Sequence, residues 1–182
     1  MYRKKLLKKY FTKRSAVFLD RDGTINFDYG YVYKFSEFEF RPYVIRGLRY
    51  LIRKRYLIFI VTNQAGIAKG KFKISDLYRL HKQLKKYLIE KKIKVTSIKF
   101  CPYHPHATIK KYRKKTNYRK PGNLMLKEIL RKHKINLNKS FMLGDKKSDK
   151  IAAKKSKLFF EFVDKNFFDQ VKKIDKKIIN SY

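Results

Sequence analysis

Short apolar runs alternate along the chain with longer segments in which apolar residues recur every three or four positions. The apolar runs predict buried strands at residues 16–19, 56–62, 95–100, 139–144 and 158–163. The periodic segments predict helices over residues 43–54, 75–92 and 122–133 and from about 165 onward, with Ser75 as the N-cap of the second. Strands that alternate with helices indicate an α/β fold with a three-layer, Rossmann-like parallel sheet and helices on both faces.

This pattern continues without a repeat, a linker or a second domain. We therefore expect residues 15–182 to form one domain without a large cap, preceded by a basic extension over residues 1–14. The extension lacks the continuous apolar core and the small-residue cleavage site of a secretory signal. No apolar run approaches the ~18 residues of a membrane-spanning helix, so we expect no membrane insertion.

Two carboxylates, Asp20 and Asp22, follow the first apolar run directly and precede a turn at Gly23 and Thr24. Ligands of open α/β sheets bind beyond the carboxyl ends of the strands, so both acids are expected at that edge. Two converging Asp side chains repel each other unless a cation lies between them. One can attack an electrophile while the other transfers a proton. Paired acids are also common in solvated loops, so this motif alone leaves both interpretations open.

Other polar residues stand where later strands end. Thr62 ends the second apolar run, where its hydroxyl group can bind a phosphate oxygen or act only as a cap. Lys120 precedes the third helix, and as one lysine among many it carries no functional signal by itself. Asp145 follows the fourth run and places a further carboxylate where a strand ends. Asp149, four residues later, is expected to hold this loop and Lys146 in place.

The chain is strongly basic, with 49 Lys and Arg against 14 Asp and Glu and a formal charge of +35. Such a charge is typical of proteins that bind nucleic acid or anionic membranes. Here the lysines are spread over the whole chain beside many Ile, Phe, Tyr and Asn residues, as expected from an AT-rich coding sequence. We therefore attribute most of the charge to genome composition, and nucleic-acid binding stays open as the lesser alternative. The single cysteine, Cys101, excludes an internal disulfide and fits a reducing compartment.

The motifs DRDGT, a strand ending in VTN, RKP before a helix and GDKKSD resemble, in this order, those of the haloacid dehalogenase superfamily of phosphohydrolases. The resemblance implies the fold of that superfamily, with Asp20 as nucleophile and Asp22 as general acid/base. It implies that Thr62 and Lys120 bind the phosphoryl group. It also implies a Mg²⁺ ion held by Asp20, Asp145 and the backbone carbonyl of Asp22.

Further motifs between residues 16 and 150 are DxGYV, EFEFxP, VTNQxGIAxG and CPxHP, and they resemble the D-glycero-D-manno-heptose 1,7-bisphosphate phosphatases, a group shared with histidinol phosphatases. The resemblance implies an enzyme that removes the 7-phosphate of a small sugar bisphosphate during ADP-heptose synthesis for lipopolysaccharide or related glycans. The substrate-binding residues that it implies are Asp28, Tyr29, Gly30, Tyr31, Asn63, Gln64, Ala65, Arg119 and Lys146. Separately from the resemblance, we expect a cytoplasmic protein and a monomer.

One feature of these relatives is missing here. Many of them bind structural zinc through cysteines and a histidine in the loop before RKP, but this chain keeps only Cys101, with Tyr103, Thr116 and Tyr118 at the other ligand positions. One thiolate falls short of the four ligands that a structural zinc needs, so we expect no zinc of this type. Aromatic packing by Tyr103, Tyr112 and Tyr118 is expected to order the loop instead.

Three functional interpretations follow from the residues and the resemblance. The first is a heptose bisphosphate phosphatase that works through an aspartyl-phosphate. The second is a histidinol-phosphate or polynucleotide 3′-phosphatase of the same fold. The third is a non-catalytic basic protein that binds nucleic acid, and the presence of Asp20, Asp22, Thr62, Lys120 and Asp145 together argues against it.

Overall fold

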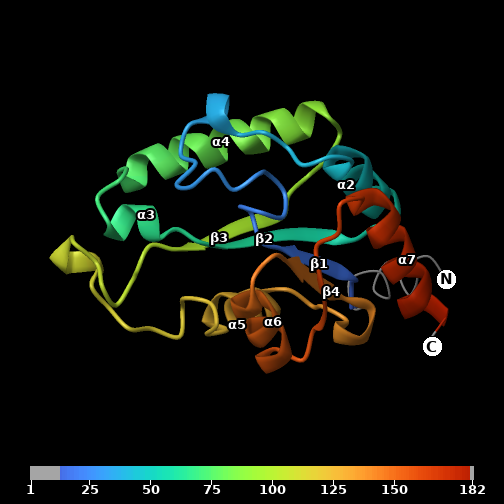
Figure 1. Ribbon diagram of the computed structural model, residues 1–182. Coiled ribbons are helices and arrows are strands. Elements are labelled where there is room, and N and C mark those ends of the chain that lie inside the picture. Colours follow the sequence, from blue (N-terminus) through green and yellow to red (C-terminus); the bar gives the residue numbers. More distant parts are fainter. Residues whose placement is uncertain (1–12, 181–182) are drawn as a thin grey trace, which may run out of the picture.

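The computed structural model describes residues 13–180 and places five parallel strands in one sheet, in the order β3-β2-β1-β4-β5 (Figure 1). The strands are β1 (Ala16–Leu19), β2 (Leu57–Asn63), β3 (Ser97–Cys101), β4 (Phe141–Gly144) and β5 (Phe159–Phe162). All pair in parallel register, with Phe18 of β1 opposite Phe59 of β2 and Met142 of β4. The predicted parallel α/β sheet is confirmed, and each predicted strand lies within two residues of its observed bounds.

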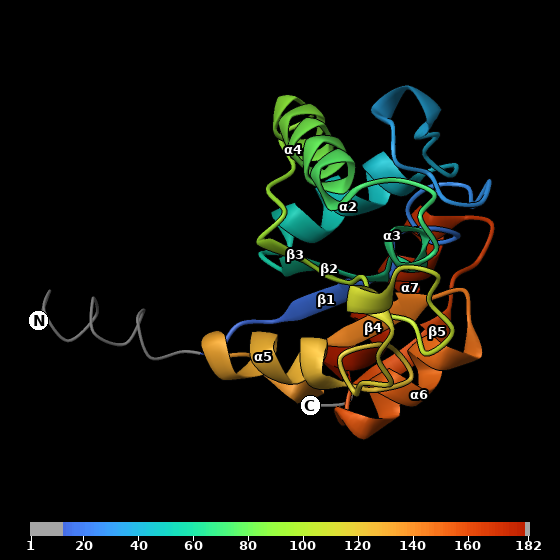
Figure 2. The same ribbon diagram turned by 90° about the vertical axis from the view of Figure 1, so that its left-hand side faces the viewer.

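Helices cover both faces of the sheet, which gives the predicted three layers (Figures 1 and 2). The helices are α2 (Val44–Arg53), α3 (Ala65–Ala68), α4 (Ile74–Glu90), α5 (Leu124–Lys132), α6 (Lys147–Lys155) and α7 (Phe167–Asn180), with short 3₁₀ turns at Phe35–Glu37, Lys110–Tyr112 and Leu137–Lys139. Helices α2, α4 and α7 pack on one face and α5 and α6 on the other. Within residues 13–180, no helix has the length and the apolar character needed to cross a membrane.

The central strand β1 separates two apolar cores because its side chains alternate between the faces. Val17 and Leu19 join the core under α2, α4 and α7, whereas Ala16 and Phe18 join the core over α5 and α6. All four are fully buried. A strand buried on both faces must be apolar throughout, which explains why β1 reads as an uninterrupted run.

Three details of the sequence interpretation need correction or fall outside the structure. Ser75 is not the N-cap of α4, because the helix begins at Ile74 and the Asp76 carboxylate accepts a hydrogen bond from the Lys73 N–H at 2.9 Å. Helices α3 and α6 were not predicted, since α3 has four residues and α6 is mostly charged. The proposed extension over residues 1–14 lies almost wholly outside the described residues, and Arg14 already pairs with Ile135.

A buried carboxylate joins α7 to the rest of the domain. Asp175 is 1% exposed and accepts hydrogen bonds from the hydroxyl groups of Tyr50 on α2, at 2.7 Å, and of Tyr56 before β2, at 2.8 Å. Burial, followed by these contacts with Asp175, raises the pKa of Tyr50 to about 12. The two tyrosines and the aspartate therefore form one polar connection inside an otherwise apolar interface.

We expect Asp175→Ala to lower the free energy of unfolding by about 2–4 kcal/mol, because it leaves the hydroxyl groups of the buried Tyr56 and the half-buried Tyr50 without an acceptor. Urea denaturation measures this change. Lys176→Gln, at the next and exposed position of α7, is the matched control and should alter stability by less than about 0.5 kcal/mol. Equal stability of the two variants would show that Asp175 does not anchor α7.

Candidate active site

The candidate site lies at the edge of the sheet where the parallel strands end. Asp20 follows β1, Asp145 follows β4, and Thr62 is the last residue but one of β2. Parallel strands present their carboxyl ends at one edge of the sheet, which brings these three residues together although they are distant in sequence. Lys120 lies in the segment before α5 and reaches the same edge through its ion pair with Asp20.

A buried ammonium group holds two of the carboxylates. Lys120 is 3% exposed, and its Nζ lies 2.8 Å from Asp20 Oδ1, 2.5 Å from Asp149 Oδ1 and 2.7 Å from the Val61 carbonyl oxygen. The ammonium group therefore has two ion-pair partners and one hydrogen-bond acceptor. Burial alone would lower the pKa of Lys120, but the charges of Asp20 and Asp149 outweigh burial and raise it. Lys120 is therefore a fixed positive charge beside Asp20.

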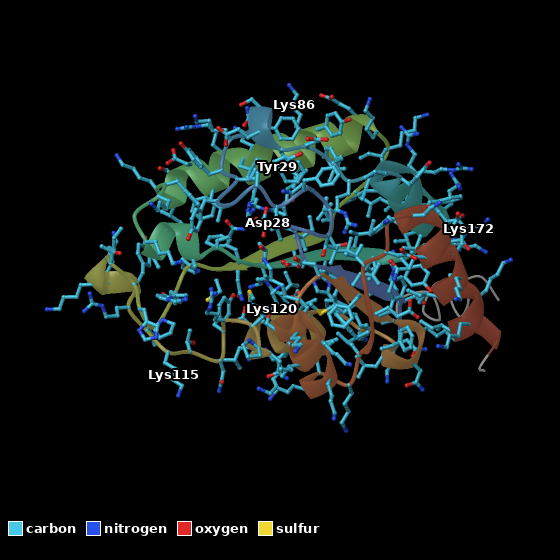
Figure 3. All side chains as sticks on the ribbon, viewed as in Figure 1. Asp28, Tyr29, Lys86, Lys115, Lys120 and Lys172 are labelled. Carbon is cyan, nitrogen blue, oxygen red and sulfur yellow. The ribbon has the colours of Figure 1, made fainter. Side chains whose placement is uncertain are left out.

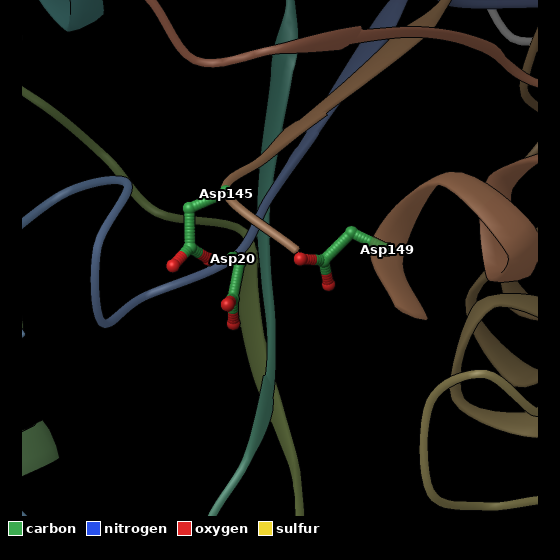
Figure 4. Close-up of side chains that lie close together, drawn as sticks. All are labelled: Asp20, Asp145 and Asp149. Atoms are coloured by element: carbon green, nitrogen blue, oxygen red, sulfur yellow. The ribbon is translucent and has the colours of Figure 1, made fainter. Parts of the chain in front are cut away.

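Asp20, Asp145 and Asp149 form an acidic cluster in which one oxygen atom from each residue lies within 4.8 Å of the others (Figure 4). Burial, and next the charge of Asp20, raise the pKa of Asp145 to about 6. Asp145 Oδ1 is buried and has no hydrogen-bond partner among the described residues. An unpaired buried carboxylate oxygen facing a second carboxylate is a place that fits a hard divalent cation.

Two glycines allow these groups to approach so closely. Gly23 has a φ of +81°, and a Cβ atom there would collide with the Asp145 carboxylate. A Cβ atom at Gly144 would lie 2.5 Å from the Cβ atom of Asp149. The motifs DRDGT and GDKKSD therefore need glycine for space as well as for backbone conformation.

The Asp22 carboxylate has a donor on every side. Arg21 donates from Nε to Oδ1 at 2.9 Å and from Nη2 to Oδ2 at 2.8 Å. Asn26 donates to Oδ1 at 3.0 Å and Gln64 to Oδ2 at 2.8 Å. The Asp22 side chain is not part of the acidic cluster, but it lines the same cleft as Asp20.

The predicted residues after β2 divide between two tasks. The Asn63 side chain exchanges two hydrogen bonds with the Lys120 backbone, at 2.9 and 3.1 Å, and so holds Lys120 in place. Gln64 donates from Nε2 to Thr62 Oγ1 at 3.0 Å as well as to Asp22. Ala65 lines the cleft at the start of α3.

The site opens into a cleft of about 600 Å³. Of the predicted site residues it is lined by Asp20, Asp22, Asp28, Gly30, Tyr31, Thr62, Asn63, Gln64, Ala65, Arg119, Lys120 and Lys146. Tyr29 and Asp145 are not part of the lining. Tyr29, labelled in Figure 3, is 63% exposed and donates its hydroxyl hydrogen bond to Glu39. The sequence interpretation missed Gly66, Lys69, His104, Pro121 and Ser148, which also line the cleft.

Cations lie at the rim of this cleft. Lys146 Nζ pairs with Asp28 at 2.9 Å and lies 3.8 Å from Asp145. Burial alone would raise the pKa of Asp28, but the hydrogen bond and charge of Lys146 lower it below its usual value. Lys69 donates to the Tyr31 hydroxyl group at 3.0 Å on the opposite side. An anionic ligand entering the cleft would thus meet basic side chains from several loops.

The chain resembles known phosphatases over most of its length. A family model described as Polynucleotide kinase 3 phosphatase matches residues 18–174. A D-glycero-beta-D-manno-heptose-1,7-bisphosphate 7-phosphatase of Photorhabdus laumondii is 41% identical over 143 residues, which cover 79% of this chain and 76% of the relative. The protein of the same name from Escherichia coli strain K12 is 38% identical over 138 residues, which cover 76% and 72% of the two chains. This chain belongs to the heptose bisphosphate phosphatase family.

A solved structure agrees with this family assignment at the level of the fold. The D,D-heptose 1,7-bisphosphate phosphatase of B. bronchiseptica, crystallised with magnesium and phosphate, superposes with a TM-score of 0.78 at 21% identity. The match covers 90% of this chain and 99% of that one. A structure from Mesorhizobium loti that is described as a HAD-like phosphatase superposes with a TM-score of 0.81 at 27% identity and covers 91% of this chain and 88% of that one, so the predicted membership of the haloacid dehalogenase superfamily is confirmed.

In this member of the heptose bisphosphate phosphatase family, side-chain contacts order the loop before Arg119. The Tyr103 and Tyr112 rings lie 6.2 Å apart, and the Tyr118 hydroxyl group donates to Glu128 at 3.2 Å. Glu128 also pairs with Lys99 of β3 at 2.6 Å. Burial raises the pKa of Cys101, which keeps this thiol protonated. The predicted aromatic packing is present for Tyr103 and Tyr112, while Tyr118 adds a polar contact that the sequence did not reveal.

A buried histidine lies behind the site in this family member. His81 of α4 is 6% exposed, and its Nε2 lies 3.4 Å from Arg21 Nη1. Its ring also contacts Phe100 of β3. Burial, and then the charges of Arg21 and Lys85, lower the pKa of His81 to about 3. His81 is therefore neutral in the folded protein at physiological pH.

The neutral state of His81 predicts a pH dependence of stability. From the ordinary pKa of 6.5 down to about 3, the unfolded chain binds a proton at His81 that the folded protein does not bind. As the pH is lowered through this range, the free energy of unfolding should therefore decrease by up to about 1.4 kcal/mol per pH unit because of this group alone. His81→Gln should remove that contribution in urea titrations at neutral and mildly acidic pH, whereas His106→Gln, at an exposed histidine, should not. Parallel pH dependences for the wild type and His81→Gln would contradict the neutral buried state.

Proposed function

We propose that the chain hydrolyses the 7-phosphate of D-glycero-D-manno-heptose 1,7-bisphosphate. The observation that carries the proposal is that the Asp20 carboxylate, paired with Lys120, lies close to the Asp145 carboxylate beside an open cleft that Asp20 and Lys120 line. The curated relatives at 41% and 38% identity bear the name of this activity. We further propose a cytoplasmic monomer in which residues 15–182 form one catalytic domain.

The same acidic cluster supports Mg²⁺ as the cofactor. Asp20, Asp145 and the backbone carbonyl of Asp22 would hold the ion, since Asp149 is already paired with Lys120. When bound, Mg²⁺ would neutralise the facing carboxylates and the phosphoryl oxygens, which allows a carboxylate to approach an anionic ester. The partnerless Asp145 Oδ1 and the relative crystallised with magnesium and phosphate support this assignment.

The residues of the chain divide the reaction into two steps. Asp20 attacks phosphorus in line, so a bond forms between Asp20 and phosphorus while the bond from phosphorus to the sugar oxygen breaks. Asp22 gives its proton to the departing sugar oxygen, and then takes a proton from the water that hydrolyses the aspartyl-phosphate. Lys120 and the Thr62 hydroxyl group stabilise the charge on the phosphoryl oxygens.

The cleft supports recognition of a small, doubly phosphorylated sugar. Helix α3 and the loop from residue 25 to 43 border the site without a large cap (Figure 2). The cleft beside them, of about 600 Å³, can therefore admit a small molecule. Arg119 and Lys146 lie at its rim and can bind phosphate, while the segments Asp28–Tyr31 and Thr62–Ala65 would contact the sugar. A sugar oxygen that reaches Asp22 must displace the Gln64 amide, which now occupies that position.

A polynucleotide 3′-phosphate is the second candidate substrate. The matching family model carries that name, and the chain has a formal charge of +35. Lysines extend from well-separated parts of the surface, among them Lys86, Lys115 and Lys172 (Figure 3). A charge spread in this way does not form a track that leads to the cleft, so we place this substrate second.

We expect the protein to release phosphate from heptose 1,7-bisphosphate at a much higher kcat/KM than from histidinol phosphate or a 3′-phosphorylated oligonucleotide. Asp20→Asn should lower kcat by about three orders of magnitude or more while the fold is preserved. Asp169→Asn, at an exposed aspartate on α7, is the matched control and should keep full activity. Full activity of Asp20→Asn would refute the nucleophile, and preference for the oligonucleotide would refute the sugar.

Removal of Mg²⁺ gives a separate prediction that does not depend on the substrate. At a Mg²⁺ concentration about 100-fold above the dissociation constant, binding should raise the free energy of unfolding by about 2.7 kcal/mol. Asp145→Asn should abolish this stabilisation because it removes one of the two facing carboxylates, whereas Asp169→Asn should retain it. Thermal unfolding with and without Mg²⁺ measures the effect, and an unchanged Mg²⁺ response of Asp145→Asn would exclude the proposed metal site.

A further inference from the structure

Arg21 is the largest fully buried side chain among the described residues, with 0% exposure. It stands between Asp20 and Asp22 in sequence, but unlike them it does not line the cleft. Its guanidinium group donates to both oxygens of Asp22 and to the Val32 carbonyl oxygen at 2.7 Å. Burial of a guanidinium group costs free energy unless the group is paired and hydrogen-bonded. The contacts with Asp22 and Val32 offset this cost for Arg21.

The Nη1 group of Arg21 faces His81 of helix α4. Nη1 of Arg21 lies 3.4 Å from His81 Nε2. Burial, and then the charges of Arg21 and Lys85, lower the pKa of His81 and keep its ring neutral. A neutral imidazole can offer a lone pair to the guanidinium, whereas a protonated one would repel it. Helix α4 is therefore connected to the Asp22 carboxylate through His81 and Arg21.

We propose that Arg21 is a positioning residue for the phosphatase reaction, that its guanidinium fixes the orientation of the Asp22 carboxyl group, and that His81 fixes the guanidinium. This inference rests on the proposed role of Asp22 in proton transfer. Arginine suits this task because its planar fork meets both oxygens of one carboxylate, which a lysine ammonium cannot do. Asn26 and Gln64 each contact a single oxygen of Asp22 and cannot set its plane alone.

A disoriented Asp22 would affect some substrates more than others. Release of a sugar alkoxide requires a proton from Asp22, whereas release of p-nitrophenolate does not, because that anion is stable in water. kcat/KM reports the steps up to the first irreversible one, which is phosphoryl transfer to Asp20. A purely structural defect in the fold or the cleft would lower kcat/KM for both substrates alike.

The test compares kcat/KM for the heptose bisphosphate and for p-nitrophenyl phosphate in Arg21→Met, Arg21→Lys and Asp22→Asn. We expect each variant to lose about 10²-fold with the sugar ester and less than about threefold with the aryl ester. In the double variant R21M/D22N the loss should equal that of D22N alone, because both changes remove one function. An equal loss on both substrates, or additive losses in the double variant, would overturn the proposal.

Position 81 supplies the second part of the test. His81→Phe should show the same substrate-dependent loss, and His81→Gln should recover most of it because the Gln carbonyl can accept from Arg21. Lys82→Gln, at the next and exposed position of α4, is the control and should behave as the wild type. Equal activity of the Phe and Gln variants would remove His81 from the proposal.

A nitrogen-15 NMR spectrum of the arginine side chains detects the contacts of Arg21 with Asp22 and His81 independently of catalytic activity. We expect one slowly exchanging Nε–H signal that is absent in Arg21→Lys and shifts in both Asp22→Asn and His81→Phe. If the wild type hydrolyses neither substrate, the proposed function fails, and this signal still decides the positioning contact. An Arg21 signal that exchanges as fast as those of exposed arginines, or that Asp22→Asn leaves unchanged, would overturn the inference.

Discussion

The structure depends on one buried positive charge, the ammonium group of Lys120. Asp20, Asp145 and Asp149 could not share the end of a parallel sheet as three ionised carboxylates without it or an added cation. Lys120 forms ion pairs with Asp20 and Asp149 and donates a hydrogen bond to the Val61 carbonyl oxygen of β2. Removing one partner from such a buried ionic group typically costs about 3–5 kcal/mol, so these residues act as a unit.

The fold serves to deliver these charges to one place. Strands β1 and β4 are neighbours in the sheet, so Asp20 and Asp145 follow adjacent strand ends. Asn63 carries Lys120 to the same edge by binding its backbone, although the two are far apart in sequence. The apolar cores on the two faces hold the strands in register. The clustered carboxylates at the edge of the sheet, in contrast, destabilise the fold and are explained by their function.

The sequence predicted the strands and the members of the site better than it predicted their contacts. Strand β1 could be assigned without error because a strand buried on both faces must be an uninterrupted apolar run. Helix α6 escaped prediction because its charged residues give no apolar stripe, and Ser75 was a false cap because Asp76 binds the free N–H instead. Nothing in the sequence distinguished Arg21 among the 49 basic residues. The ion pair of Asp149 with Lys120 could not be predicted either, because an ion pair between distant segments produces no characteristic spacing in the sequence.

The most direct test is a crystal structure of the protein grown with Mg²⁺ and beryllofluoride, which adds to an aspartate in place of a phosphoryl group. The account predicts the adduct on Asp20, with Mg²⁺ shared by Asp20 and Asp145 and with Lys120 Nζ still bound to Asp149. An adduct on another carboxylate, or a Mg²⁺ ion that binds Asp149 and displaces Lys120, would contradict it.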